Sequence, residues 1–415
     1  MQDNEKKPAL RFKGFTDPWE QRKLGDAFER VVRKNTNNES WLPLTISAQD
    51  GLVDQITYFN NRVASRDVSN YYLVYNGEFA YNKSTSDGYP FGAVKRLDWY
   101  EKGVLSTLYI VFALKHPEKD DSDFMTVFYD TDRWHRGVAE RAAEGARNHG
   151  LLNISAEDFF DIDTTMPEDK VEQEKIGRLL KKLDTLITLH QRKYEKLVNI
   201  KKSMLNKMFP PNGASVPEIR FKGFTDPWEQ RKLDEIANFS KGVGYSKNDL
   251  CEEGTPIILY GRLYTKYETS IFDVDTFVKE KAGSVYSKGG EVIVPASGET
   301  AEDISIASVV VKPGILLGGD LNIVSPTTEY DSAFLALTIS SGAAHKYLSS
   351  LAQGKSVVHL HNADIQSVSA KFPTKREQEK IHLLFGKIDT LITLHQRKLE
   401  KLQNIKKSCL EKMFV

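Results

Sequence analysis

The 415-residue sequence contains only two cysteines and has no run of eighteen apolar residues. The missing apolar run argues against a membrane-spanning helix, and the polar start MQDNEKKPAL lacks the layout of a secretion signal. Cys251 and Cys409 lie far apart and match no metal-binding spacing. These absences favour a soluble cytoplasmic protein, without a membrane contact, in which each reduced thiol is buried.

Motifs for chemistry on nucleotides or nucleic acids are also missing. A methyltransferase acting on an exocyclic amine needs an Asn/Asp-Pro-Pro-aromatic platform, whereas the only double proline, FPPN at 209–212, has another order. The nearest match to a phosphate-binding loop ends in Gly354, Lys355 and Ser356, but Ser349 occupies the position of its first glycine. The sequence shows no nuclease cluster and no His/Cys metal spacing. We therefore predict a chain that is no enzyme and binds no cofactor or metal itself.

The net charge is zero, from 57 basic and 57 acidic residues, but the charges are divided into blocks. Residues 170–207 hold eleven Lys/Arg against four Asp/Glu, and residues 375–413 hold ten against five, which gives +7 and +5. Residues 25–166 hold fifteen against twenty-two, and residues 234–371 hold eleven against seventeen, which gives −7 and −6. Two basic segments that alternate with two acidic ones indicate a repeated plan.

Two segments of the chain occur twice. RFKGFTDPWEQRKL is identical at 11–24 and 220–233, and we call these copies the first and second boxes. A longer segment, EQEKIGRLLKKLDTLITLHQRKYEKLVNIKKSMLNKMF at 172–209, returns with few changes at 377–414. The order is therefore box, middle, helix, box, middle, helix, with a period near half the chain.

The longer repeat has the heptad pattern of a helix that pairs with another helix. A helix of roughly 40 residues spans about 60 Å, and we predict that the two copies pair antiparallel. The histidines of the pattern are expected to be packed seam residues rather than ligands. The predicted seam comprises Ile176, Leu183, His190, Leu197, Met204, Ile381, Ile388, His395, Leu402 and Cys409, with Leu180, Ile187, Tyr194, Met208, Phe385, Ile392, Leu399 and Met413 following four positions later.

The middles, 25–166 and 234–371, differ in sequence but share a skeleton, and we call them the first and second domains. GEFAYNKS at 77–84 corresponds to GEVIVPAS at 290–297, a glycine turn followed by an alternating strand and a polar loop. Each domain is predicted to be α+β, with short irregular strands and one or two helices.

Further segments of the two domains support this prediction. Residues 104–112 and 315–325 are each expected to form a buried strand, and one or two helices are expected, for instance around 331–352. The predicted fold is α+β, with two similar domains separated by two long antiparallel coiled-coil helices in an internal pseudo-two-fold repeat. The predicted boundaries are 1–165 and 211–371 for each box with its domain, and 166–210 and 372–415 for the helices.

The identical flanks suit one kind of partner that is bound twice, and the divergent middles suit two different ligands. The alternative is a recent duplication, or recombination between the copies, that kept the flanks alike without selection on binding. That alternative does not explain why the middles diverged. We therefore interpret the repeat as two identical sockets and two different readers.

These features resemble the DNA specificity subunit of bacterial type I restriction–modification systems over nearly the whole chain. The resemblance is carried by the helix signatures at 172–193 and 377–398, each containing DTLITLHQRK, and by the openings LRFKGFTDPWE and IRFKGFTDPWE. It is also carried by GEFAYNKSTSDGYPFGAV at 77–94 and GEVIVPASGET at 290–300.

The resemblance implies a non-catalytic subunit with two target-recognition domains. Each domain would read one half of an interrupted site in double-stranded DNA, and the helices would act as a ruler between the halves. Two methyltransferase subunits would bind S-adenosylmethionine and methylate adenine, and two endonuclease/translocase subunits would use ATP and Mg. The acidic balance of both domains departs from the expectation for DNA readers, and it suggests that partner subunits share phosphate neutralisation.

Base-reading side chains are expected on loops that can enter a DNA groove. For the loop at 82–92, a purely structural turn is the alternative, because Gly and Pro fix backbone shape as readily as contacts. The predicted readers of the first domain are Asn82, Lys83, Ser84, Ser86, Tyr89, Arg147 and Asn148, and those of the second are Tyr260, Arg262, Tyr264, Ser297, Glu299, Thr300, Lys355, Ser356 and His359.

Two other functions were weighed against a DNA-specificity module. A self-contained modification enzyme would need the cofactor and catalytic motifs that the sequence lacks. A coiled-coil scaffold that binds only proteins would need the helices but would leave the two divergent domains without a role.

Overall fold

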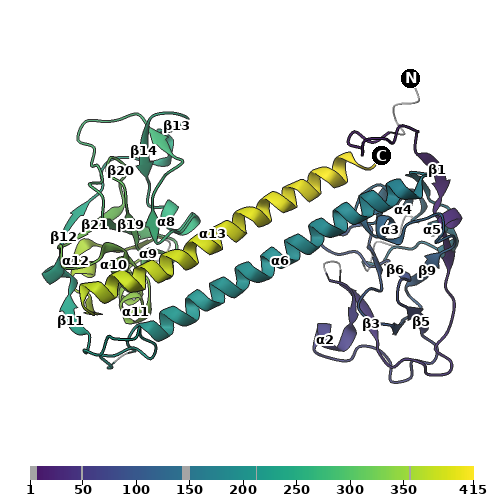
Figure 1. The fold of residues 1–415 in the computed structure, drawn as a ribbon, viewed down its shortest axis with the longest axis horizontal. Helices are drawn as coiled ribbons and strands as arrows, with labels where there is room; N and C mark the ends of the chain where they lie inside the picture. Colours follow the sequence, from purple (N-terminus) through teal and green to yellow (C-terminus); the bar gives the residue numbers. More distant parts are fainter. Residues whose placement is uncertain (1–6, 48–49, 143–149, 212, 355–356) are drawn as a thin grey trace. The chain divides into compact units, whose positions relative to one another are not determined.

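The computed structural model describes residues 7–47, 50–142, 150–211, 213–354 and 357–415 (Figure 1). Two long helices, α6 (Lys170–Met208) and α13 (Lys375–Lys412), accompany α+β domains, as predicted. The chain divides into two compact units, with Met1–Leu189 and Leu399–Val415 in unit 1 and His190–Lys398 in unit 2. No helix in the described part of the chain is long and apolar enough to cross a membrane.

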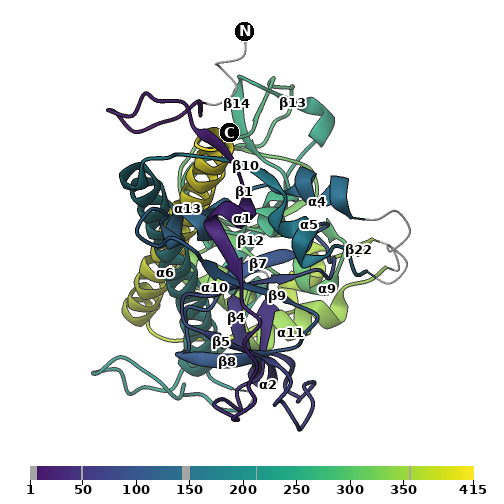
Figure 2. The ribbon, with the colours of Figure 1, turned by 90° about the vertical axis from the view of Figure 1, so that its right-hand side faces the viewer.

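Unit 1 is built on a four-stranded antiparallel sheet in the order β2-β9-β6-β7. Smaller pairs form between β1 and β10, which lie side by side in Figure 2, between β3 and β4, and between β5 and β8. Its elements before α6 are β1 (Glu20–Lys23), α1 (Leu24–Ala27), β2 (Phe28–Arg30), β3 (Leu44–Ser47), β4 (Gly51–Asp54), α2 (Gln55–Phe59), β5 (Tyr72–Tyr75), β6 (Phe79–Asn82), β7 (Ala93–Arg96), β8 (Lys102–Leu105), β9 (Ile110–Leu114), α3 (Ser122–Phe128), α4 (His135–Arg141), α5 (Ala156–Phe160) and β10 (Asp163–Met166).

Unit 2 is built on a five-stranded sheet in the order β12-β21-β17-β19-β15, with a four-stranded sheet β13-β16-β14-β20 beside it in the fold. Its elements between the long helices are β11 (Glu229–Lys232), α7 (Leu233–Ile236), β12 (Ala237–Lys241), η2 (Lys247–Asp249), β13 (Leu250–Cys251), β14 (Thr255–Ile258), α8 (Arg262–Thr265), β15 (Ser270–Ile271), β16 (Phe277–Val278), β17 (Glu291–Pro295), β18 (Ser297–Gly298), α9 (Ala301–Ile304), β19 (Ser308–Val310), β20 (Leu316–Leu317), β21 (Leu321–Pro326), α10 (Ser332–Ile339), α11 (Gly342–Leu351), β22 (Val358–His359), α12 (Asn362–Gln366) and β23 (Ser369–Phe372).

The main sheets of the two units share four strands in the same order. The series β2-β9-β6-β7 in unit 1 corresponds to β12-β21-β17-β19 in unit 2, and all neighbours in both series are antiparallel. The strand β17 is buried at all five positions, including Glu291, so the alternating strand predicted within 290–297 needs correction: neighbouring elements cover both faces of β17. The shared strand order gives the two divergent sequences a common skeleton.

Two of three local predictions need correction. Residues 104–112 form the end of β8 and the start of β9 rather than one strand, because Tyr109 N–H donates to Ser106 O in a turn and exposes Leu108. Residues 315–325 likewise contain β20 and β21, separated by a turn in which Asp320 has φ +57°. The region 331–352 contains two helices, α10 and α11, in agreement with the one or two helices expected there. Apolar runs concealed these turns because their flanking strands are buried on both sides.

Each box fixes the first turn of a long helix through an arginine that binds a buried glutamate with two nitrogens. In unit 1, Arg11 contacts Glu172 at 2.6 and 2.8 Å, and Glu172 is only 1% exposed. In unit 2, Arg220 contacts Glu377 at 2.7 and 2.8 Å, and Glu377 is fully buried. A two-nitrogen contact offsets the cost of burying the carboxylate. Identical sequence therefore makes identical contacts in the two units.

The residue just before each box also contacts the last turn of the other long helix. In unit 1, Leu10 N–H donates to Lys412 O at 2.8 Å. The corresponding bond in unit 2 joins Ile219 N–H to Lys207 O at 2.9 Å. A box thus bridges the start of one long helix and the end of the other, which is the contact pattern of a pseudo-two-fold repeat.

A buried tryptophan completes each of these junctions. Trp19 packs edge-on against Phe414 at the end of α13, with ring centroids 6.1 Å apart. Trp228 packs edge-on against Phe209 after the end of α6, with ring centroids 5.8 Å apart. Edge-on aromatic pairs add to the energy of burial, so each box stabilises both helix ends that it touches.

The two long helices run antiparallel where they meet inside unit 2. His190 Nδ1 lies 2.8 Å from His395 Nδ1, and Lys201 Nζ lies 2.5 Å from an oxygen of Asp389, so the residue numbers run in opposite directions. Burial lowers the pKa of His190, and the neighbouring His395 adds to this effect, which favours the neutral ring. The two rings therefore form a polar contact in the seam between the helices.

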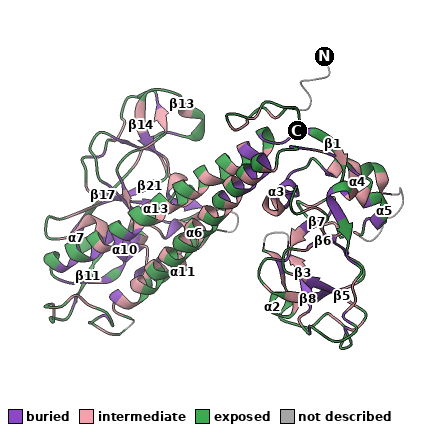
Figure 3. Cartoon of the chain, turned by 45° about the vertical axis from the view of Figure 1, so that its right-hand side comes forward, coloured by how far each residue is buried: buried purple, intermediate pink, exposed green. Residues whose placement is uncertain are grey.

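The predicted seam residues are all buried or half-buried, whereas the outer faces of both helices are exposed (Figure 3). In unit 1, Ile176, Leu180 and Leu183 share a core with Cys409 and Met413. In unit 2 the corresponding core contains Met208, Ile381, Phe385 and Ile388. Cys409 is buried and Cys251 half-buried, and both are free thiols.

We expect Leu183→Asp to lower the thermal unfolding midpoint strongly, because it places a carboxylate at a position that is only 7% exposed, at a cost of about 3 kcal/mol or more. Leu391→Asp is the matched control, since Leu391 is 44% exposed on the flank of the repeat. Melts followed by circular dichroism measure both variants. Equal midpoints for the two would contradict a buried seam at Leu183.

Candidate DNA-recognition surfaces

The predicted reading loop of the first domain connects β6 to β7 and is closed by its own hydrogen bonds. Ser86 and Tyr89 exchange backbone bonds at 2.9 and 3.3 Å, and Asn82 accepts the Ser84 N–H at 3.0 Å. Ser84 and Ser86 are exposed, while Asn82, Lys83 and Tyr89 are half-buried. The backbone of the loop is fixed by these bonds, as a purely structural turn would be. The exposed hydroxyl groups of Ser84 and Ser86 remain available for contacts with DNA.

A second chain segment is tied to the base of this loop. Leu152 N–H donates to Lys83 O at 2.9 Å, and Thr85 N–H donates to Gly150 O at 2.6 Å. The Lys83 ammonium reaches the Ile154 carbonyl at 3.4 Å, so this predicted reader also supports the local fold. Arg147 and Asn148 lie outside the described residues.

The predicted readers of the second domain gather at the end of β17. Ser297 pairs with His359 across β18 and β22, and the Leu360 N–H donates to Ala296 O at 3.0 Å. Thr300 caps the short helix α9 by accepting the Asp303 N–H at 3.1 Å, which leaves Glu299 exposed beside it. Lys355 and Ser356 lie outside the described residues.

Two tyrosines from the segment after β14 lie near this group. The rings of Tyr260 and Tyr264 have centroids 6.2 Å apart. Burial raises the pKa of Tyr264, and Tyr260 and the carboxylate of Glu299 raise it further. Tyr264 therefore keeps its hydroxyl proton and lies close to Glu299, so segments about 35 residues apart in sequence contribute to one polar surface.

Arg262 is placed differently from the other predicted readers. Its guanidinium lies 2.8 Å from Glu268 and 2.7 Å from Asp275, and the side chain is only 9% exposed. Lys266, with a weaker contribution from Arg262, lowers the pKa of Asp275 to about 2. The structure therefore gives Arg262 a role in holding Glu268 and Asp275 together, and its donors are directed inward rather than toward a DNA groove.

The two surfaces occupy equivalent places on the shared skeleton. In each unit, the strand that follows the glycine turn, β6 or β17, ends in a polar loop. That loop is bonded to the segment before α5 or α12 through the carbonyl of Lys83 or Ala296. Different side chains thus stand at one structural position, as expected for two readers of different sequence.

Exposed aromatic residues of the first domain were missed from the sequence. Tyr58 and Phe59 pack edge-on at 5.0 Å and are each 50% exposed on α2, and Trp99 is 71% exposed. The adjacent aromatic letters at 58–59 were the available signal, but adjacent aromatics also fit a buried strand. In the part of the chain that the structure describes, no group of His, Cys, Asp or Glu is arranged to hold a metal ion.

Residues 225–404 match the family of type I restriction modification DNA specificity domains. The type I restriction enzyme MjaVIII specificity subunit of Methanocaldococcus jannaschii is 22% identical over 319 residues, covering 74% of this chain and 72% of that relative. Residues 225–404 therefore belong to the family of type I restriction modification DNA specificity domains, and the chain is similar over about three quarters of its length to a type I specificity subunit. The resemblance drawn from the repeated helices and boxes is confirmed. The matched family is one that gives DNA specificity to type I restriction modification.

The fold of the specificity subunit is shared with a solved relative. The crystal structure of the S subunit of the type I restriction–modification system from M. genitalium matches with a TM-score of 0.59. The match covers 99% of both chains although only 14% of the aligned residues are identical. The arrangement of elements is therefore retained where the sequence is not.

We predict that, in the second domain, Arg262→Met lowers stability whereas Glu299→Gln changes the DNA sequence that is read. Arg262→Met removes the cation from two carboxylates and should cost roughly 1–2 kcal/mol, seen as a lower unfolding midpoint. Glu299→Gln changes an exposed side chain and should leave the midpoint unchanged while altering the methylated sequence. Lys266→Met, which removes a more exposed partner of Asp275, is the control for Arg262→Met. An Arg262→Met protein as stable as the parent would contradict the structural role.

Proposed function

We propose that this specificity subunit reads a two-part, interrupted site in double-stranded DNA, with one domain reading each part. The proposal is supported by the equivalent positions of the two loop surfaces and by their different side chains. Major-groove reading requires side chains with hydrogen-bonding groups on exposed loops, and both surfaces supply hydroxyl, amide, carboxylate or imidazole groups. The divergence of the two surfaces favours two different half-sites.

The repeated parts are proposed to bind two methyltransferase subunits, through which two endonuclease/translocase subunits join. The observation that carries this step is the duplication of the box junctions, since Arg11 with Glu172 and Arg220 with Glu377 create the same local structure twice. A surface repeated under an internal two-fold fits two copies of one partner. S-adenosylmethionine, ATP and Mg would then be bound by the partners, and this chain would act in the cytoplasm without catalysis of its own.

The charge distribution fits a division of labour in DNA binding. The first and second domains carry −7 and −6, from fifteen basic against twenty-two acidic residues and eleven against seventeen. Binding to phosphates needs lysine and arginine side chains that displace condensed cations. In both domains the acidic residues outnumber the lysines and arginines. We propose that the domains provide base selection while the basic helices and the partner subunits provide most of the phosphate contacts.

Exchange of one domain tests this function. We expect that replacing residues 25–165 with the corresponding domain of a related subunit changes one half of the methylated motif and leaves the other half intact. The reciprocal exchange of residues 234–371 is the matched control and should change only the other half. The measurement is a genome-wide map of methylated adenine in cells that also express the methyltransferase.

Each remaining outcome identifies another function. Simultaneous change of both halves would contradict separate readers. Methylation by the purified chain without a methyltransferase would support a self-contained enzyme. An empty map in the presence of an assembled methyltransferase would support a protein scaffold.

A further inference from the structure

One ion pair between the long helices occurs in both units. In unit 1, Lys406 Nζ of α13 lies 2.7 Å from Asp184 of α6. In unit 2, Lys201 of α6 and Asp389 of α13 occupy the equivalent repeat positions and lie 2.5 Å apart. Partly buried charges tolerate little displacement because separation leaves each one without a partner. These pairs therefore fix how the two helices meet in each unit.

The pair in unit 1 extends into the first domain. Asp130, which follows α3, accepts hydrogen bonds from Lys406 at 3.3 Å and from Lys95 of β7 at 2.9 Å. Burial favours a raised pKa for Asp130, but Lys95 and Lys406 outweigh burial and hold its pKa below the ordinary value. We call Lys95, Asp130, Asp184 and Lys406 the first anchor, since it joins both long helices to the central sheet.

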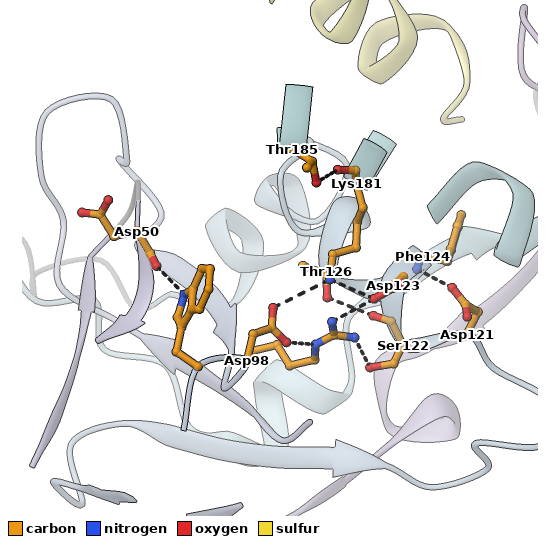
Figure 4. Close-up of polar contacts among 11 residues, drawn as sticks. Asp50, Asp98, Asp121, Ser122, Asp123, Phe124, Thr126, Lys181 and Thr185 are labelled. Carbon is orange, nitrogen blue, oxygen red and sulfur yellow. Dashed lines mark hydrogen bonds and ion pairs between the residues drawn. The ribbon is translucent and has the colours of Figure 1, made fainter. Parts of the chain in front are cut away.

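A neighbouring polar network supports the same junction (Figure 4). Arg96 of β7 donates to Asp98 at 2.6 Å and to Asp123 of α3 at 2.8 Å. Lys181 of α6 reaches the same Asp123 oxygen at 3.0 Å. Lys95 and Arg96 are adjacent on β7, so this strand is linked to α13 through Asp130 and to α6 through Asp123.

The pair in unit 2 extends into the second domain through different groups. Thr269, which precedes β15 and is 5% exposed, donates its hydroxyl to Asp389 at 2.8 Å. Lys201 lies 3.5 Å from the Thr269 hydroxyl and 5.5 Å from the centre of the Tyr267 ring. We call Lys201, Tyr267, Thr269 and Asp389 the second anchor. The helix part is identical in the two anchors, whereas the domain part differs.

We infer that the two anchors set the angle of each recognition domain about the helix pair and thereby select the length of the unread spacer in the DNA site. This inference rests on the proposed reading of a two-part site. One base pair more or less rotates a half-site by roughly 35°, from 10 to 10.5 base pairs per turn. A domain that could turn freely about the helices would accept several spacers, so spacer selection needs contacts that resist rotation.

Lys406→Met tests the first anchor, with Lys407→Met as the matched control because Lys407 is its exposed neighbour. Thr269→Val tests the second anchor with a substitution of nearly the same shape. Each full-length variant is assembled with the methyltransferase and given duplexes that carry the parent half-sites with the parent spacer or with one base pair more or fewer. The measured quantity is the ratio of methylation rates on the parent spacer and on the altered spacers.

We expect this ratio to fall by about fivefold or more for Lys406→Met and Thr269→Val, since displacements of about 1 Å change rates by up to about a hundredfold. The half-site bases should stay the same, and Lys407→Met should behave as the parent. An unchanged ratio, or an equal loss of rate on every spacer, would overturn the inference in favour of a purely structural role. If Lys406→Met does not fold, Thr269→Val decides. A parent motif without an interruption would instead overturn the proposed function.

Discussion

The contact between an arginine fork and a buried glutamate at the first turn of each long helix is the constraint on which the rest of this subunit depends. Glu172 and Glu377 lie at helix starts, where the helix dipole favours a negative charge. Their near-complete burial would be costly without Arg11 and Arg220, which satisfy both oxygens of each carboxylate. The position of each box follows from this pairing.

Because a box also holds the end of the other helix, the contacts of one unit reappear in the other with exchanged partners. The backbone bonds Leu10–Lys412 and Ile219–Lys207 and the rings Trp19–Phe414 and Trp228–Phe209 show this exchange directly. The arginine and the tryptophan of each box therefore make the same structural contacts in both units. The divergent residues lie between these junctions, on loops whose backbone is tied down at Lys83 or Ala296 while their side chains vary.

The long helices could be predicted from the sequence because a heptad pattern repeats over many turns, and two copies of it restrict the possible partners. The contacts between the boxes and the helix ends could not be predicted. Arg11 and Glu172 lie 161 residues apart, and a single charged pair produces no periodic pattern in the sequence. Arg262 was predicted as a reader for a related reason. Its acidic partners Glu268 and Asp275 come close only when the segment between them folds back.

The anchors illustrate the same limit in another way. Lys201 and Asp389 are polar letters on the flank of a heptad, a position where solvated charges are usual. Only the approach of Thr269 from the second domain distinguishes them from ordinary surface residues. Turns within apolar runs, as at Ser106–Tyr109, likewise could not be predicted, because the buried strands on either side form one nearly continuous apolar stretch in the sequence.

Our central proposal is that the two domains read DNA independently and that the length of the helix pair sets the spacer between their half-sites. Insertion of four residues after Lys193 and four after the equivalent Lys398 would lengthen both helices by about 6 Å while keeping nearly the same helical face. The decisive measurement is the methylated motif produced by this variant with its methyltransferase. The account predicts unchanged half-site bases and a spacer longer by about one or two base pairs, at roughly 3.4 Å each. A folded, active variant that retains the original spacer would contradict it.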